Sequence, residues 1–502
     1  MADSVVTRID YLGHAGFVVD HGGTRVLIDP WFGSAFLESW FPFPDNHHLR
    51  DGVLAGRYDA LYVSHTHADH LDRDLLGGLP RDLPVLCAAF RSRDLHKVFR
   101  RLGFTEVVTL GHRESVELGA GVRATMLLDT SHKEDSALQL DLGDFRFVDL
   151  NDCHPKLSEL PRDVDLLAAQ FSGAMWYPNC YDYGAAEMAA KVAQVRNGLV
   201  DTLVRTVAAT DARCYLPCAG PPVFLDPELG GFNDADATIF PRWEDVAGRF
   251  AAALPEVAVV RVQPGDHVVV DGRATVPQPA PRPAPTDVDA YRARRAAQWQ
   301  AHQARPDGEV TTGELDAYFA RLVRRNLALL AGYARDVALV AGDRTWTVRV
   351  RPEPDGPTVV DGPPPGPVYE FRMAPRVLRA IVDGDATWEE ALLSLRISLR
   401  RSPDLFDVTL MGLLRYGETP VVTRQLVLDS TVSDETIERD GVRMQRFCPH
   451  AGEDLNHATV TGGRIECPRH HWAWDLATGE CVQGGTLPLS VTPLAEPAVS
   501  SR

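Results

Sequence analysis

Long apolar runs, a basic leader and a disulfide framework are all missing from this sequence. No apolar stretch reaches the roughly 20 residues that a membrane-spanning helix needs, and no apolar segment follows a basic N-terminal start. Six cysteines, which lie outside the motif described below, show no spacing typical of a disulfide scaffold. These absences predict a chain of a reducing cytoplasm without a membrane span.

Basic residues are also in the minority. Lysine and arginine number 51 against 69 acidic residues, which gives a net charge of −18. Such a balance argues against nucleic acid or an anionic membrane as the main partner. The 502 residues, 45% of them hydrophobic, are enough for about three domains with cores of their own.

A cluster-binding pattern lies near the C-terminal end. Cys448 and His450 are followed, after a spacer of 16 residues, by Cys467 and His470. A Rieske [2Fe–2S] cluster needs two thiolates on one iron and two imidazoles on the other. A zinc ribbon is the alternative, but the Cys-x-His pairing and the long spacer disfavour it. The segment resembles the Rieske family, and it predicts a one-electron relay held by these four residues.

A second metal-binding pattern lies near the other end of the chain. The string from His65 to His70, His-Thr-His-Ala-Asp-His, follows a short apolar strand predicted at 61–63. It resembles the HxHxDH signature of the metallo-β-lactamase superfamily, and a solvated histidine-rich loop is the alternative. Asp29 matches the acidic strand end beneath the metals of that superfamily, and Gly13-His14 matches the start of its lactonase-like branch. The resemblance implies an αβ/βα sandwich with metals at its open edge.

The same resemblance implies further ligands. His132 matches the third histidine position and Asp152 the bridging aspartate, while His154 either joins the site or lies beside it. No histidine follows the strand predicted at 214–216, where Cys218 is the only soft ligand. A second metal would therefore lose a ligand, and a mononuclear iron(II) site with open positions for O₂ and substrate fits better, although one or two ions stay open. The candidate catalytic residues are His65, His67, His132 and Asp152, and the candidate metal ligands add Asp69, His70 and His154.

Together the two patterns resemble the CMP-N-acetylneuraminate hydroxylase family. Matching stretches over most of residues 1–275 are Phe145-Arg146-Phe147, Phe171-Ser172-Gly173, Tyr215-Leu216-Pro217 and Gln263-Pro264-Gly265. That family hydroxylates the methyl of an N-acetyl group on a nucleotide sugar, with electrons passed through a Rieske centre. The animal enzymes carry the Rieske part first, whereas it is last here, so the substrate is not carried over.

Composition divides the chain into four parts. We expect a metallo-β-lactamase-like catalytic domain at 1–276, a proline-rich linker at 277–286, an α+β middle domain at 287–420 and a small antiparallel β Rieske domain at 421–502. In the middle domain, 287–305, 312–333 and 388–401 are predicted to be mainly helical, and 337–350 contains two strands. Arg396, Arg400 and Arg401 form a predicted cationic face, either solvated or docking an anion.

Three functions follow from these features. The first is an O₂-dependent monooxygenase that hydroxylates or N-oxygenates a small polar metabolite with non-haem iron. The second is a metal-dependent hydrolase with the Rieske domain as a redox-sensing or structural appendage. The third is an electron-transfer module whose front domain serves for docking. No flavin or nicotinamide fingerprint is present, so the first function implies an external donor, either a ferredoxin, a reductase or a cytochrome b5-like protein, and the resemblance to Rieske oxygenases implies a homo-oligomer.

Overall fold

The computed structural model describes residues 6–119, 121–129, 133–280, 287–353, 356–366, 369–424, 434–450, 452–469 and 471–494. The chain forms two compact units. The first consists of 1–129, 134–309 and 373–398, and the second of 130–133, 310–372 and 399–502. The domain boundaries expected from composition stay a prediction.

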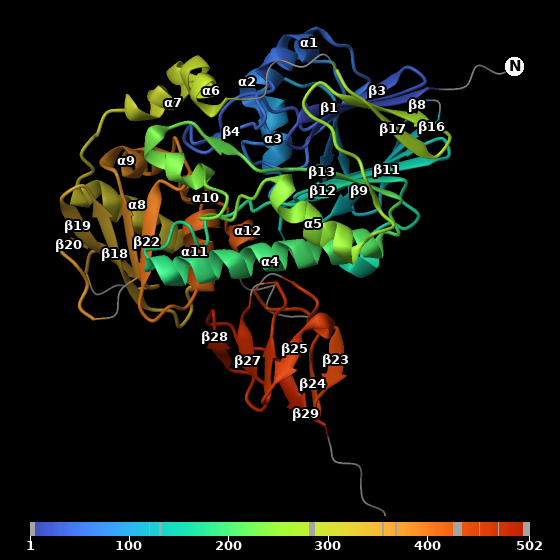
Figure 1. Cartoon of the computed structure of the whole chain (residues 1–502). Coiled ribbons are helices and arrows are strands. Elements are labelled where there is room, and N and C mark those ends of the chain that lie inside the picture. The colour runs from blue at the N-terminus through green and yellow to red at the C-terminus, as the bar shows by residue number, and fades with distance from the viewer. Residues whose placement is uncertain are drawn as a thin grey trace, which may run out of the picture. The chain divides into compact units, whose positions relative to one another are not determined.

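Two large sheets form the first unit (Figure 1). One has eight strands in the order β17-β16-β1-β2-β3-β5-β6-β7, and the other has seven in the order β15-β13-β12-β11-β10-β9-β8. The strands of the first sheet are β1 (Thr7–Gly13), β2 (Gly16–His21), β3 (Thr24–Ile28), β5 (Ala60–Tyr62), β6 (Val85–Ala88), β7 (Val107–Leu110), β16 (His267–Asp271) and β17 (Ala274–Gln278). Those of the second are β8 (Ser115–Gly119), β9 (Val122–Leu128), β10 (Ser136–Leu142), β11 (Phe145–Asn151), β12 (Leu166–Gln170), β13 (Cys214–Cys218) and β15 (Ala258–Val259).

Strand β11 shows how the layers are built. Phe145 and Phe147 belong to the core between the two sheets, whereas Val148 and Leu150 belong to the core on the other face of β11. Side chains alternate between the faces of a strand, so the apolar residues of β11 contribute to two cores, one on each face. The core that contains Val148 and Leu150 also includes residues of α4 (Ala185–Ala209) and α5 (Trp243–Ala253). Residues of α2 (Arg73–Leu76) and α3 (Asp94–Arg101) pack with the first sheet. The predicted αβ/βα sandwich is confirmed.

The predicted metal-binding side chains of the sandwich lie at the ends of several strands. His14 lies in the turn between β1 and β2, Asp29 follows β3, the string 64–70 follows β5 and Asp152 follows β11. Strands β3 and β5 are parallel, so their carboxyl ends meet at one edge of the sheet. His14 and Asp29 have positive φ values of 52° and 35°. Such backbone is uncommon for residues other than glycine, and it tends to mark functional edges.

The first unit also includes two helical segments from later in the chain. Helices α6 (Val288–Arg294) and α7 (Ala296–Gln303) divide the predicted helix 287–305 at Arg295. Helices α9 (Pro375–Asp383) and α10 (Trp388–Leu393) follow, and the predicted helix 388–401 is wrong beyond α10, because 397–401 forms strand β22 (Ile397–Arg401).

Arg396 is buried in this unit, not part of a solvated cationic face. Its guanidinium lies 2.8 Å from Asp226 Oδ2, with side-chain exposures of 4% and 0%. Its Nε also donates to the carbonyl oxygen of Leu37 at 3.1 Å. Arg401 is nearly as buried and pairs with Asp404, whereas Arg400 is exposed beside Glu370. The expectation of one cationic face was wrong because each arginine has its own carboxylate.

Replacing Arg396 with alanine should lower the free energy of unfolding by about 3–5 kcal/mol, because it leaves the Asp226 carboxylate buried without its cation. Arg162 and Asp211 form an exposed pair in the same unit at 2.9 Å. Arg162→Ala should therefore cost under about 1 kcal/mol. Urea unfolding of the metal-free variants measures both changes, and equal small losses would contradict a stabilising role for the buried pair.

The second unit contains helices and most of a five-stranded sheet in the order β20-β19-β18-β21-β22. Strands β18 (Arg335–Ala341) and β19 (Arg344–Val350) confirm the two predicted in 337–350. The expected helix 312–333 is shorter, since α8 (Thr312–Arg325) ends eight residues earlier. The remaining elements are β20 (Val359–Asp361), β21 (Tyr369–Met373), α11 (Val408–Tyr416) and α12 (Pro420–Arg424).

Small antiparallel sheets make up the end of the second unit. One contains β23 (Thr436–Arg439), β24 (Val442–Gln445) and β29 (Val491–Pro493). The other contains β25 (Thr459–Thr461), β26 (Arg464–Glu466), β27 (Ala473–Asp475) and β28 (Cys481–Gln483). A small antiparallel β domain is therefore confirmed at this end of the chain, whereas its bounds of 421–502 stay a prediction. In the described part of the chain, no helix combines the length and apolarity needed to cross a membrane.

Candidate metal centres

The first group of potential ligands is His65, His67 and Asp152. One donor atom of each lies within 4.8 Å of the others. The two closest are His65 Nε2 and His67 Nδ1, which are 2.8 Å apart. Two ligands bound about 2.0–2.2 Å from one ion can be that close, so both nitrogens are placed to share a metal.

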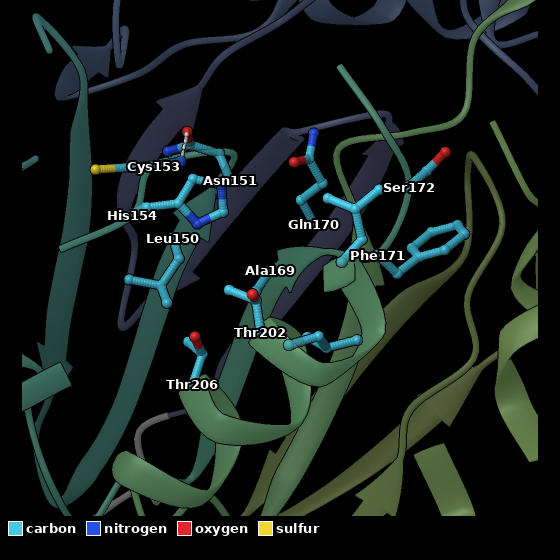
Figure 2. A pocket seen from close by; sticks show the side chains of 12 residues that line it. Leu150, Asn151, Cys153, His154, Ala169, Gln170, Phe171, Ser172, Thr202 and Thr206 are labelled. Atoms are coloured by element: carbon cyan, nitrogen blue, oxygen red, sulfur yellow. Dashed lines mark hydrogen bonds between the residues drawn. The ribbon is translucent and has the colours of Figure 1, made fainter. Parts of the chain in front are cut away.

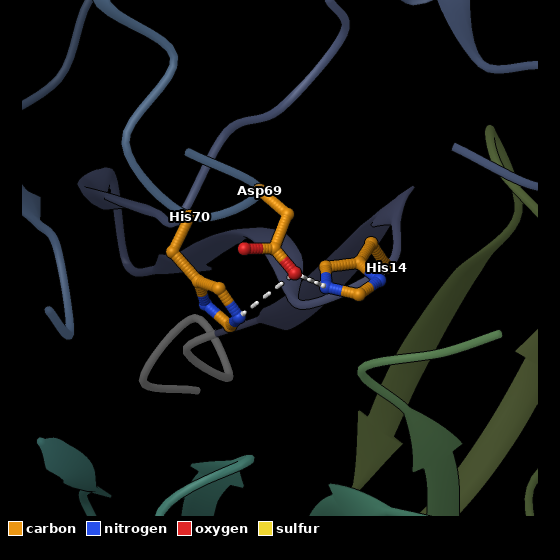
Figure 3. Close-up of side chains that lie close together, drawn as sticks. All are labelled: His14, Asp69 and His70. Carbon is orange, nitrogen blue, oxygen red and sulfur yellow. Dashed lines mark ion pairs between the residues drawn. The ribbon is translucent and has the colours of Figure 1, made fainter. Parts of the chain in front are cut away.

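The second group is His14, Asp69 and His70 (Figure 3). Asp69 Oδ2 lies 3.2 Å from His14 Nε2 and 3.9 Å from His70 Nε2. All three residues are buried. Sequence reasoning counted a ligand as lost because no histidine follows the strand at 214–216. The structure places His14 beside Asp69 and His70 instead, and the Gly-His of the β1–β2 turn is the signal that could have found it.

Asp152 lies between the two groups. Its Oδ1 is 3.9 Å from His65 Nδ1 and 3.5 Å from His70 Nε2. Burial would raise the pKa of the Asp152 carboxyl, but the rings of His70 and His65 lower it to about 2. The carboxylate therefore stays ionised at neutral pH, which is the form that binds a metal.

Two of the three histidines of the string, His65 and His70, differ in protonation. Burial lowers the pKa of His65 well below its ordinary value, so its imidazole is neutral. Burial also lowers the pKa of His70, but the carboxylates of Asp152 and Asp69 have the larger effect. They raise the pKa of His70 well above its ordinary value. A metal bound at His70 must displace that proton.

Asp29 and Ser64 determine which ring nitrogens face the site. Ser64 Oγ donates to Asp29 Oδ2 at 2.6 Å, so its oxygen accepts from His65 Nδ1 at 3.0 Å. Asp29 Oδ2 also accepts from His70 Nδ1 at 2.8 Å. In both histidines Nδ1 carries the proton of these bonds, which leaves Nε2 for a metal.

Several buried atoms of these side chains fit a bound cation. Among the described residues, His14 Nε2, His70 Nε2, Asp69 Oδ1 and Asp152 Oδ1 make no hydrogen bond. A buried polar group without such a partner costs about 1–3 kcal/mol, so several at one place call for an explanation. Metal ions would supply the missing partner, and imidazole with carboxylate is a donor set for iron, zinc or manganese.

The other predicted front residues have different positions. His132 lies outside the described residues. His154 belongs to none of the ligand groups found in the described chain; it lines a pocket with Asn151, Gln170 and Ser172, beside helix α4 (Figure 2). Cys218 is buried, and burial raises the pKa of its thiol well above the ordinary value. A third group, Asp129, Asp135 and Cys153, borders the first, with Asp135 Oδ1 3.3 Å from His65 Nδ1.

Three of the four predicted Rieske ligands, Cys448, His450 and Cys467, lie in two loops of the second unit. Cys448 and Cys467 are buried thiols at 1% and 0% exposure. The ring of His450 stacks on Trp472 with centroids 4.3 Å apart and planes 9° apart, and Phe406 contacts the same ring edge-on at 5.4 Å. His470 lies outside the described residues. Two buried thiols and an imidazole held between aromatic rings fit a Cys₂His₂ cluster.

Comparison with known proteins matches the two ends of the chain to different domain families. Residues 8–195 match the beta-lactamase superfamily domain, and residues 416–492 match the Rieske [2Fe-2S] domain. The chain is 30% identical over 515 residues to a Rieske 2Fe-2S iron-sulfur protein of Mycobacterium tuberculosis (strain CDC 1551 / Oshkosh), covering 95% of this chain and 98% of the relative. The chain belongs to this family of Rieske 2Fe-2S iron-sulfur proteins.

Two further similarities cover part of this Rieske protein. Cytidine monophosphate-N-acetylneuraminic acid hydroxylase of Pan troglodytes is 28% identical over 229 residues, which are 42% of this chain and 38% of the relative. The structure of CmlA, a diiron beta-hydroxylase from Streptomyces venezuelae, covers 54% of both chains at 18% identity with a TM-score of 0.37. The predicted combination, a metallo-β-lactamase fold with a C-terminal Rieske domain, is confirmed.

Proposed function

We propose that this protein is a Rieske-dependent non-haem iron monooxygenase that hydroxylates or N-oxygenates a small polar metabolite. The observation that carries the proposal is the pair of ligand groups joined by Asp152 in a chain that also carries a Rieske domain. A one-electron relay has no use in hydrolysis, whereas reduction of O₂ needs electrons. The name of the partial relatives, which are hydroxylases, supports the same reaction class.

In this proposal, His65, His67 and Asp152 hold one iron, and His14, Asp69 and His70 are placed to hold a second. Iron would activate O₂ there, with single electrons supplied through a cluster held by Cys448, His450, Cys467 and His470. His132 remains a further candidate ligand. An external donor, a ferredoxin, reductase or cytochrome b5-like protein, would reduce the cluster.

The residues of the chain itself have three tasks in this scheme. Asp29 and Ser64 hold His65 and His70 with their Nε2 atoms toward the metals. Asp152 contributes a carboxylate that stays ionised at neutral pH. The buried position of His14, Asp69 and His70 keeps water from competing for the second ion.

Zinc hydrolysis is the second candidate function, because histidine and aspartate in these positions also bind zinc and activate water. Metal content separates the two. A monooxygenase should contain about three or four irons per chain, two of them in the cluster, whereas a hydrolase should contain two irons with zinc. Elemental analysis of protein purified without added metal, combined with O₂ uptake on a substrate screen, tests the proposal. Zinc in the front site together with hydrolysis that persists without O₂ would contradict it.

A further inference from the structure

Helix α10 brings a buried carboxylate to the front site from a distant part of the sequence. Glu389 is 8% exposed, and its Oε1 lies 3.8 Å from Nε2 of His67. No superfamily signature in the sequence includes this residue. Glu389 and His67 both belong to the first unit.

The two nitrogens of His67 face different groups. Nδ1 lies 2.8 Å from His65 Nε2 and so points to the proposed metal, while Nε2 points to Glu389. His70 has the reverse arrangement, since its Nδ1 bonds to Asp29 and its Nε2 faces Asp69. A histidine that binds a metal through one nitrogen commonly donates the other N–H to a carboxylate, which determines the tautomer and orients the ring. Glu389 occupies for His67 the place that Asp29 occupies for His70.

Two contacts of the first unit fasten the segment that carries Glu389. The buried pair of Arg396 and Asp226 ties its end to the loop after β14 (Val223–Phe224). The Sγ of Cys180 donates to the carbonyl oxygen of Leu392 at 3.6 Å. With these contacts inside one unit, the helix holds Glu389 in place before any metal binds.

We propose that Glu389 is a positioning residue for the front metal. It accepts the Nε2–H of His67, directly or through one water, and thereby presents Nδ1 to the ion. The separation of 3.8 Å is longer than a hydrogen bond, which ends at about 3.2 Å, so a bridging water or a small ring rotation closes it. The inference rests on the proposed metal site at His65 and His67.

The test is a metal titration of the full chain with its cluster assembled and its front site stripped by a chelator. Equilibrium dialysis against Co²⁺ gives the dissociation constant without any turnover. Glu389→Gln, which keeps the shape and removes the charge, should weaken Co²⁺ binding roughly 10–100-fold. Asp385→Asn is the matched control, since Asp385 is an exposed acid in the same segment and should change nothing.

A double-mutant cycle with His67→Ala shows whether Glu389 acts through His67. In the His67→Ala background, Glu389→Gln should cause no further loss. Equal losses in both backgrounds, or wild-type affinity in Glu389→Gln, would overturn the inference. If Glu389→Gln does not fold, the comparison of Glu389→Asp with Glu389→Ala tests the inference instead. Glu389→Asp keeps a carboxylate and should bind Co²⁺ more tightly than Glu389→Ala. Equal affinities of these two variants would overturn the inference. Wild-type protein that binds no metal at the front would refute the proposed function itself, a result distinct from these.

Discussion

Replacing His65 with alanine is expected to abolish substrate-dependent O₂ uptake while the Rieske centre remains reducible. His65 Nε2 lies 2.8 Å from His67 Nδ1, and the ring is buried in the first unit, so alanine removes one of the proposed direct ligands of the metal. Loss of a direct ligand should exceed the roughly 10–100-fold loss typical of an outer partner. Product formation and O₂ consumption measure the effect, and dithionite reduction followed by EPR reports on the cluster.

His48→Ala is the control for this change. His48 is exposed in the first unit and belongs to none of the ligand groups found in the described residues. It should leave metal content and turnover unchanged. If His65→Ala formed product near the wild-type rate, the chemistry would have to lie outside the front site.

The second large effect is expected from Cys467→Ala. The thiol is completely buried, and the backbone N–H of Cys467 donates to the carbonyl oxygen of Trp472. Removing one thiolate from four ligands should eliminate the visible absorbance and EPR signal of the cluster, because the iron would keep only the thiolate of Cys448. Iron in the front site should persist, since its proposed ligands lie in the other unit.

Cys481→Ala is the matched control, because Cys481 is a half-buried thiol of the same small domain outside the ligand motif. Its cluster spectrum should equal that of the wild type. A Cys467→Ala protein that folds but loses the iron of both sites together would contradict two independent centres.

Both metal-binding patterns could be recognised from the sequence alone, because each is a short string of residue types that rarely occur together for another reason. The string from His65 to His70 begins soon after the buried strand β5, so its histidines and Asp69 lie near the end of that strand. Cys448, His450 and Cys467 likewise lie in loops beside short strands. The sandwich fold was also predictable, because the superfamily signature occurs at a particular edge of that sandwich.

Only the tertiary structure determined which other residues belong to these sites or support them. His14 completes the second ligand group; its Gly-His pair matches the superfamily in sequence, but only the position of its turn beside Asp69 makes it a candidate ligand. Glu389 and Arg396 lie in a segment that sequence reasoning assigned to another domain with a solvated face. Their burial against the front fold depends on carboxylate, imidazole and guanidinium groups hundreds of residues apart. Local periodicity carries no information on such pairs, because the favourable energy of a buried charge comes from the partner that the fold brings to it.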